Sequence, residues 1–313
     1  MTPSRLSALV ACAAALALAG CGKQETGAGQ KSGAAAPQRV VEEKPAPYTY
    51  PAPVKGHYKE INIGEFDVVD GIAYPATGGG GTVVYVTDKP IASPMLAESV
   101  CPMTQARALT ELRNARYLEV TLDPSGRSKY FAAGTAFGGS SREQDVGGRY
   151  WSARVKADAD RAVGSVLHKR EGRFEFDLPL SKPKVNEISQ GDWIHGQRAD
   201  QSAPKPTEPA VSAAFRAVND AALKKDLKAL LSAQGFAKAQ VNAIRGLDGI
   251  DADLAVYSDR FLTGTPGEFT AKAGTAYLRV EGTNSKGKKF VNFYHFAPCG
   301  ERLVLVSISE NPQ

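Results

Sequence analysis

The side chains with the clearest chemical potential are four cysteines, Cys12, Cys21, Cys101 and Cys299. Thiolates are nucleophiles, and paired thiols form disulfides, so their surroundings decide their chemistry. Arg5 and the apolar run Leu6–Ala19 precede Cys21. A short charged region followed by such a run has the length of a secretory signal, whereas a membrane span needs about 20 strongly apolar residues. Cys12 therefore lies within the export signal, Cys21 directly after its apolar run, and Cys101 and Cys299 in the exported protein.

The tetrapeptide Leu18-Ala19-Gly20-Cys21 resembles the lipobox of bacterial lipoproteins. In that family a peptidase cuts before the cysteine, whose sulfur carries a diacylglycerol and whose amine carries a further acyl chain such as palmitate. The resemblance implies that Cys21 is the lipidation site and the first mature residue, held in a bilayer by several chains. Gly22, in place of Asp, implies the outer membrane with the protein facing the periplasm. The alternative is an ordinary signal peptide followed by a cysteine that has no such role.

Cys101 and Cys299 remain after lipidation and cleavage. In the oxidising periplasm two remaining cysteines are expected to pair. Each lies beside a turn signal, Cys101-Pro102 and Pro298-Cys299-Gly300. A disulfide here would join the two halves of the chain, and two buried free thiols are the alternative.

The histidines give little sign of a metal site. They lie far apart in the sequence, at His57, His168, His195 and His295. Only His195 has a carboxylate at ligand spacing, Asp192, and two ligands do not make a site. Trp193 lies beside them in a polar, proline-punctuated segment, where its ring would be exposed unless it docked. Trp193 and His195 are therefore predicted either to pack on a neighbouring domain or to contact a partner.

Catalytic motifs are also missing. The sequence has no Gly-x-Ser-x-Gly elbow, His-Glu-x-x-His, Cys-x-x-Cys or Walker motif. Gly78–Gly81 lead into a β-branched run, which predicts a hairpin loop and no phosphate site. Asp248, Asp251 and Asp253 lack the glycine and distal glutamate of a calcium hand, and we interpret them as a solvated turn between helix and strand. These observations predict a protein that is not an enzyme and holds no metal or cofactor.

Length and composition describe a globular exported protein. The 313 residues suggest two domains at about 150 residues each. Apolar residues make up 42% and charged residues 23%, close to globular averages. The net charge of +5 is spread among acidic residues, which does not favour nucleic-acid binding.

Changes in composition divide the chain into five segments. Residues 1–20 are the signal peptide, and residues 21–56 form a tether whose second part alternates proline with alanine or tyrosine, typical of polyproline II. A β-rich domain is predicted over 57–182, a connector over 183–206 and an α+β domain over 207–313. Alternatively, the proline-rich part of the tether contacts the cell wall or a groove-bearing partner, with Tyr48 and Tyr50 as anchors.

The first domain is predicted to be mostly β. Phe66–Val69 and Gly71–Tyr74 look like a strand pair, and one helix is expected over Thr104–Ala115. Apolar and polar residues then alternate near 118–122, 151–155, 163–167 and 174–180. Such repeated alternation favours an antiparallel sandwich or open barrel.

The second domain changes to a helical period. Helices are expected from Thr207, after a cap at Asp220 and over Lys238–Ile244, and strands from Leu254–Tyr257 onward. The last strand, Leu303–Ile308, is apolar on both faces and is predicted to be central in its sheet. The fold class is therefore α+β, a mostly-β sandwich or open barrel with one helix followed by helices and then an antiparallel sheet.

Helices followed by long antiparallel strands in about 100 residues resemble the ketosteroid-isomerase or nuclear-transport-factor-like cone. The resemblance implies a pocket between sheet and helices, and an isomerase of that family would use an Asp base with a Tyr donor. Residues of those types are present, without a family motif, at Asp251, Asp253, Asp259, Tyr257, Tyr277 and Tyr294. No catalytic role is transferred to them.

Three functions fit these patterns. The first is a non-catalytic binding lipoprotein of the outer membrane that holds a protein partner in the periplasm, such as an immunity protein or inhibitor. The second is a small-ligand-binding or isomerase-like C-terminal cone. The third is a structural role in envelope assembly, which sequence does not separate from the first.

Overall fold

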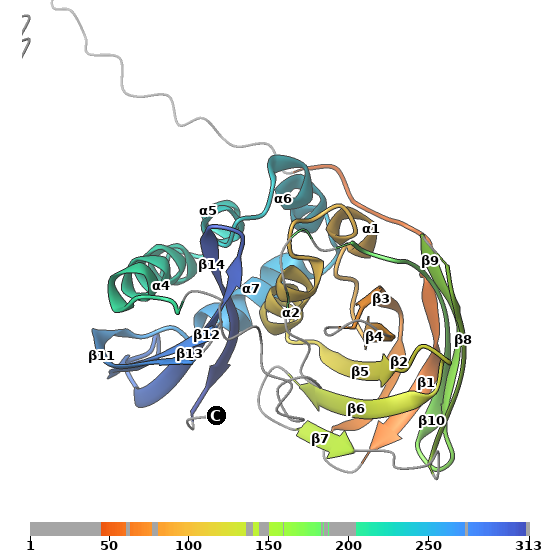
Figure 1. The fold of residues 1–313 in the computed structure, drawn as a ribbon. Helices are drawn as coiled ribbons and strands as arrows, with labels where there is room; N and C mark the ends of the chain where they lie inside the picture. Colours follow the sequence, from red (N-terminus) through yellow and green to blue (C-terminus); the bar gives the residue numbers. More distant parts are fainter. Residues whose placement is uncertain are drawn as a thin grey trace, which may run out of the picture. The chain divides into compact units, whose positions relative to one another are not determined.

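A computed structural model describes residues 45–60, 63–76, 81–135, 140–143, 150–158, 160–182, 184, 187, 205–272 and 275–310. Lys44–Gln313 form one compact unit. Within it, antiparallel sheets with few helices come first, and helices followed by an antiparallel sheet come second (Figure 1). This confirms the predicted α+β class.

The first sheet has the strand order β2-β1-β10-β9-β8 and is antiparallel throughout. Its strands are β1 (Val54–Glu60), β2 (Gly64–Val68), β8 (Trp151–Ala157), β9 (Arg161–His168) and β10 (Gly172–Pro179). Buried and exposed side chains alternate along β10, as the sequence predicts for a sheet with one solvent-facing side.

The second sheet has the order β3-β4-β5-β6-β7. Its strands are β3 (Asp70–Pro75), β4 (Thr82–Thr87), β5 (Arg116–Leu122), β6 (Ser128–Thr135) and β7 (Ser140–Glu143). The predicted pairing of Phe66–Val69 with Gly71–Tyr74 is wrong, because β2 pairs with β1 and β3 pairs with β4. The chain passes from one sheet to the other at Val69, which is too short a link for a hairpin turn between them.

The inner faces of these two sheets share one hydrophobic core. The Phe131 and Trp151 rings stack at 3.9 Å between centroids, and the Tyr58 ring lies 5.7 Å from Phe131. Aromatic rings at these separations contribute beyond their buried area. The core therefore joins β6 to the strands β1 and β8 of the other sheet.

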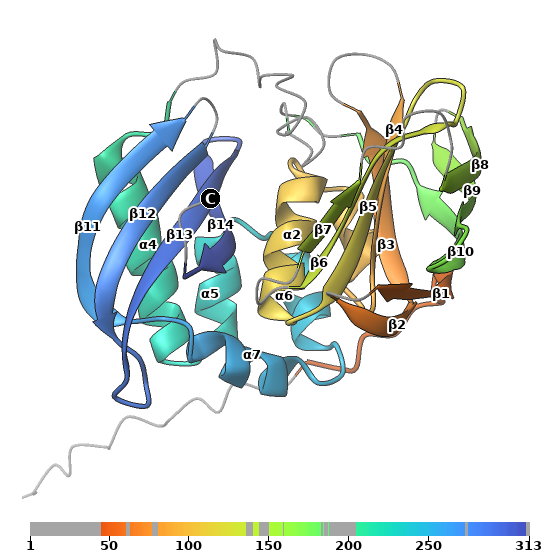
Figure 2. The same ribbon diagram turned by 90° about the horizontal axis from the view of Figure 1, so that it is seen from below.

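Between β4 and β5 lie two helices, α1 (Ser93–Leu96) and α2 (Pro102–Leu112). The predicted helix over Thr104–Ala115 thus begins and ends slightly earlier, with Pro102 at its first turn. Nearly every residue of α2 is buried. In Figure 2 α2 lies between the β5–β6 sheet and the C-terminal elements, and it packs against β3, α7 and β14. It is the central helix of the unit.

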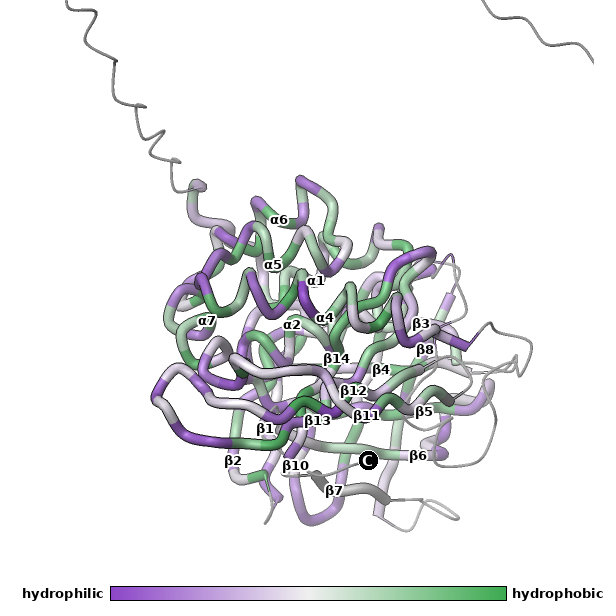
Figure 3. Tube along the Cα trace, turned by 90° about the vertical axis from the view of Figure 1, so that its left-hand side faces the viewer, coloured by the Kyte–Doolittle hydropathy of each residue, from purple (hydrophilic) through white to green (hydrophobic). Residues whose placement is uncertain are grey.

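The C-terminal elements are α4 (Glu208–Leu223), α5 (Leu227–Ala233), α6 (Lys238–Arg245) and α7 (Ile250–Ser258), followed by a meander of β11 (Thr263–Lys272), β12 (Thr275–Thr283), β13 (Lys289–Cys299) and β14 (Arg302–Ser309). Helices α5 and α6 alternate hydrophobic and hydrophilic stretches, as surface helices do (Figure 3). Tyr85 and Leu109 share a hydrophobic core with Val218 and Leu230. One core therefore spans both regions that the sequence suggests as domains.

Two helix predictions are corrected. Leu254–Tyr257 belongs to helix α7 and is not a strand, because Ile250, Leu254 and Tyr257 follow helical spacing and are all buried. Helix α4 runs past Asp220 to Leu223, and Asp226 caps α5 by accepting a hydrogen bond from the backbone of Ala229. The change of helical face near Asp220 therefore precedes the actual break between the helices.

The prediction that the last strand is central is also wrong. Strand β14 is at the end of its sheet. Val304, Leu305, Val306 and Ile308 are nevertheless buried, because α2 and α4 pack against this strand. A helix packed over the edge of a sheet buries an apolar strand as effectively as a neighbouring strand does.

Candidate binding groove

The structure differs from the expected tether over residues 45–53. We call this segment the strap, because it lies on the folded unit before strand β1. The Tyr48 amide donates to the Gly246 carbonyl at 2.9 Å. A Cβ on Gly246 would lie 2.5 Å from the Ala46 oxygen, so this close approach of two backbones requires glycine.

The strap is held to the sheet by Asp70, a buried carboxylate at the start of β3. The Tyr50 hydroxyl donates to it, and accepts from the Ala92 amide at 2.8 Å. Asp70 also accepts from the Ser93 hydroxyl at 2.5 Å and from the Ile91 amide at 2.6 Å. Burial raises the pKa of Asp70 above its usual range, although the hydrogen bonds from Ser93 and Tyr50 oppose that shift. Asp70 therefore positions the strap and the chain before α1 together.

A groove with a cavity volume of about 600 Å³ lies beside the strap. Its walls are the strap and the loop that joins α6 to α7, with Val69, Asp70 and Pro90 between them. The Tyr48 and Tyr50 rings, both groove-lining, lie 5.3 Å apart. Pockets of 300–1,000 Å³ with apolar walls and few polar groups are the usual form of binding sites.

Charged side chains surround the groove and support it. Arg245, Asp248 and Asp251 contribute to its lining. Behind the loop, Asp253 forms ion pairs with Lys89 at 2.8 Å and with Arg113 at 2.9 Å. The expectation of a turn between helix and strand is therefore wrong for Asp251 and Asp253, which lie in the first turn of α7, and Asp253 ties this helix to the end of α2.

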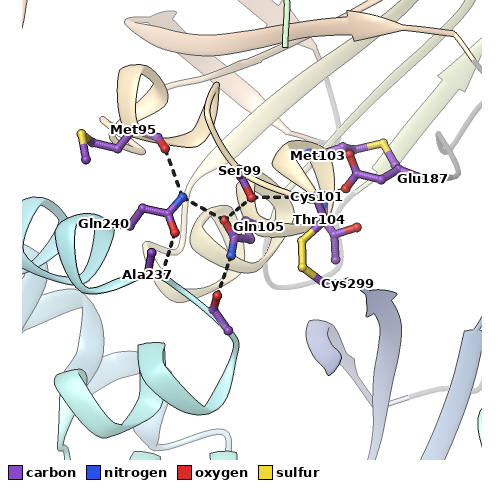
Figure 4. The surroundings of a disulfide bond; sticks show 11 residues. Met95, Ser99, Cys101, Met103, Thr104, Gln105, Glu187, Ala237, Gln240 and Cys299 are labelled. Carbon is purple, nitrogen blue, oxygen red and sulfur yellow. Dashed lines mark hydrogen bonds between the residues drawn. A yellow bond between two sulfur atoms is a disulfide. The ribbon is translucent and has the colours of Figure 1, made fainter. Parts of the chain in front are cut away.

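The disulfide between Cys101 and Cys299 lies at the start of α2 (Figure 4). Their Cα atoms are 5.4 Å apart and both residues are buried. It links the residue before α2 to the last residue of β13. The structure therefore joins the two halves of the chain at this point, as the cysteine positions predict.

A polar cluster continues along α2 from the disulfide (Figure 4). The Gln105 side chain accepts from the Ser99 hydroxyl at 2.7 Å and from the Gln240 amide at 3.2 Å. Gln240 also donates to the Met95 carbonyl at 3.0 Å. These bonds connect α2 to α1 and α6, and α6 leads directly into the groove loop.

The other candidate residues do not assemble into one site. Cys21, Trp193 and His195 lie outside the described residues. The remaining histidines lie in different surroundings: His57 is exposed between Glu65 and Asp67, His168 is buried beside Glu171, and His295 stacks on Tyr277. No cluster of three side chains suited to a metal ion occurs in the part of the chain that the structure describes.

The residue types that a cone-type isomerase would need are also dispersed. Asp251 lines the groove, Asp253 is in the ion pairs with Lys89 and Arg113, and Asp259 pairs with Lys286. The Tyr294 hydroxyl donates to the Arg260 carbonyl at 3.0 Å. The structure does not bring these aspartates together around one tyrosine.

The groove was missed at the sequence level because its walls come from residues about 200 positions apart. The only signal was Tyr48-Thr49-Tyr50 within a proline-rich segment. Rings in an otherwise polar spacer need a surface to pack on.

No protein-family model, curated protein or solved structure matches this chain. None of the helices in the described ranges combines the length and hydropathy that crossing a membrane requires.

Proposed function

We propose that this chain is a lipid-anchored, non-catalytic binding protein of the bacterial envelope. Cys21 would carry the lipid and hold the protein at the outer membrane, facing the periplasm. The folded unit would bind a protein partner, of the kind that an immunity protein or inhibitor captures. The groove beside the strap is the observation that carries this proposal.

Three properties of the groove support binding of a protein segment. Its volume of about 600 Å³ accommodates one or two large side chains. Tyr48 and Tyr50 supply aromatic surface, and aromatic residues are enriched where proteins bind each other. The Tyr50 hydroxyl in the strap and the Ser93 hydroxyl both donate to Asp70, which fixes the strap wall of the groove. A wall that is already fixed loses less conformational entropy when a partner binds.

The cone-type hypothesis receives no such support. Between the last sheet and α4, the Phe215 and Phe261 rings lie 4.8 and 5.7 Å from Tyr294. All three are buried. Closely packed aromatic rings fill this space.

Site-specific photocrosslinking in cells tests the proposal. A photoreactive amino acid replaces Thr49, an exposed groove residue, in the full-length lipoprotein, and crosslinked proteins are identified by mass spectrometry. A control places it at Glu301, which is exposed and does not line the groove. We expect one dominant partner at Thr49, absent at Glu301 and lost when Tyr48→Ala removes a ring from the wall.

Identical crosslinked proteins at both positions, or none, would contradict a binding role for the groove. The anchor is tested separately by fractionation of Cys21→Ala, which we expect in the soluble periplasm while the unchanged chain is in the outer membrane. An unchanged location would contradict lipidation at Cys21.

A further inference from the structure

A second surface, separate from the groove, lies on the solvent side of the sheet β2-β1-β10-β9-β8. In the described residues, large apolar side chains are exposed at Val100, Val163, Leu167 and Val256. Two of these, Val163 and Leu167, project from β9 with 45% and 41% of their surface exposed. Being four residues apart on one strand, they face the same side with Ser165 between them.

The strand register places opposite charges on the two sides of this aliphatic column. On β8, Lys156 lies opposite Val163 and Arg154 opposite Ser165. On β10, Asp177 lies opposite Val163 and Glu175 opposite Ser165. Neighbouring strands are about 4.8 Å apart, so each charged column borders the aliphatic one.

The carboxylates on β10 already have cationic partners. Asp177 pairs with Arg161 at 2.5 Å, and Glu175 pairs with Arg173 at 2.5 Å and with Lys55 at 3.7 Å. Opposite charges satisfied in this way leave little net field on that side.

The cations on β8, unlike the carboxylates on β10, are not in ion pairs within the described residues. These cations are Arg154 and Lys156, and both are exposed. Asp158, just after β8, accepts from the backbone of Asp160 at 3.0 Å and of Arg161 at 2.8 Å, and these bonds lower its pKa more than the charge of Lys156 does. The two cations therefore present positive charge directly beside Val163 and Ser165, and Arg154 lies one pair of residues along the strands from Leu167.

We propose that this face, defined by Arg154, Lys156, Val163 and Leu167, docks an extended acidic segment of a protein partner. Aliphatic side chains of that segment would cover Val163 and Leu167 while its carboxylates pair with the cations of β8. A narrow segment along β9 leaves Glu175 and Asp177 uncovered. A flat anionic bilayer would press its headgroups against those two carboxylates, which disfavours a lipid surface as the occupant.

Fluorescence anisotropy with a synthetic probe tests this docking. The probe is a labelled peptide of sequence Glu-Ser-Leu-Ser-Glu-Ser-Leu-Ser-Glu, whose leucines match the spacing of Val163 and Leu167 and, in an extended chain, share one face with its glutamates. Its counterpart has Lys for Glu. The protein is the full chain carrying Cys21→Ala. We expect the acidic peptide to bind at least tenfold more tightly than the basic one, and added salt to weaken it.

Variants identify the surface. R154E/K156E should lower affinity for the acidic peptide at least tenfold, and V163S/L167S several-fold. K224E/K238E reverses the same number of charges outside this sheet, at exposed lysines just after α4 and at the start of α6, and should change affinity less than twofold. All these positions are exposed, and thermal melts check that each variant folds.

Two results would overturn the proposal. One is equal affinity of the acidic peptide for R154E/K156E and the unchanged chain. The other is that the unchanged chain cosediments with phosphatidylglycerol vesicles, that R154E/K156E abolishes this cosedimentation, and that the acidic peptide does not bind. Because no residue of this face lines the groove, either result leaves the crosslinking at Thr49 unaffected.

Discussion

Glu111 and Arg260 form a buried ion pair that also satisfies the free edge of strand β14. The Arg260 guanidinium donates both to the Glu111 carboxylate and to the Ile308 carbonyl. The same carboxylate accepts from the Ile308 amide at 3.1 Å. Because no further strand pairs with β14 within the described residues, these side chains replace the missing backbone partners at Ile308.

Glu111→Ala should therefore be strongly destabilising. It leaves Arg260 buried without its countercharge and Ile308 without its acceptor, and breaking such a pair costs about 3–5 kcal/mol. Urea denaturation measures the loss in unfolding free energy. Lys182→Ala is the control, because its pair with Asp160 is exposed and worth less than about 1 kcal/mol. Equal losses in the two variants would contradict the role of the buried pair.

Removing the disulfide should lower stability without changing the fold. Cys101 and Cys299 are separated by 198 positions, and in the chain-entropy model closing so long a loop contributes up to about 5 kcal/mol. C101A/C299A should show this loss in urea, and the unchanged chain in reductant should behave similarly once unfolding exposes the bond. The disulfide should be reduced more slowly in the native protein than in the unfolded protein. Equal rates of reduction would contradict the burial of the disulfide.

Gly246→Ala should release the strap. The new Cβ would lie 2.5 Å from the Ala46 oxygen and 2.9 Å from the Tyr48 nitrogen, so the strap must move. We expect a loss of about 1–3 kcal/mol, the usual cost of overpacking, and faster cleavage by protease between residues 45 and 53. Gly267→Ala is a matched control, because its nearest neighbouring atom is 3.6 Å away. Equal cleavage rates in both variants would show that the strap does not depend on Gly246.

Asp70 should make the free energy of unfolding depend on pH in the direction opposite to that of a salt-bridged carboxylate. Burial raises the pKa of Asp70 in the folded state, so the folded state holds this proton more tightly than the unfolded chain does. The contribution of Asp70 to the free energy of unfolding is fully present below its pKa in the unfolded chain, about 3.9. This contribution is lost as the pH rises through the higher pKa of Asp70 in the folded state. The stability of the unchanged chain relative to Asp70→Asn should therefore decrease from pH 4 to pH 7. An increase over that range would contradict the shift.

The sequence predicted best those helices and strands in which apolar residues repeat at a regular spacing within the element itself. Strands β8, β9 and β10 alternate apolar and polar residues because one sheet face meets the core and the other meets water. The helix over Lys238–Ile244 was also found, because its apolar residues recur at helical spacing and Gly246 follows it. Local pattern and tertiary environment agree in these segments.

Helix α7 and strand β14 were misjudged for opposite reasons. The apolar run Leu254–Tyr257 is short enough to look like a strand, and only the wider spacing from Ile250 reveals a helix. Strand β14 is apolar on both faces, yet α2 supplies its cover from another part of the chain. Sequence reports that a residue is buried but not which element buries it.

The sequence points to one wall of the groove, through Tyr48 and Tyr50, but does not show which residues form the other. The two walls meet through the contact of Tyr48 with Gly246 and through the bond of Tyr50 to Asp70. Neither glycine nor aspartate carries a local signal that identifies such a distant partner. The cysteine pair was predictable because the chemistry of a thiol restricts its partner to another thiol.

The strap has a mechanical consequence. It is the first part of the folded unit to receive any force applied through the preceding chain. Strand β1 is bonded on both sides, to β2 and β10, whereas the strap is held at points such as Tyr48 and Tyr50. Tension would therefore peel the strap away before it reached the sheet. Since the strap forms one wall of the groove, a taut chain would open the groove.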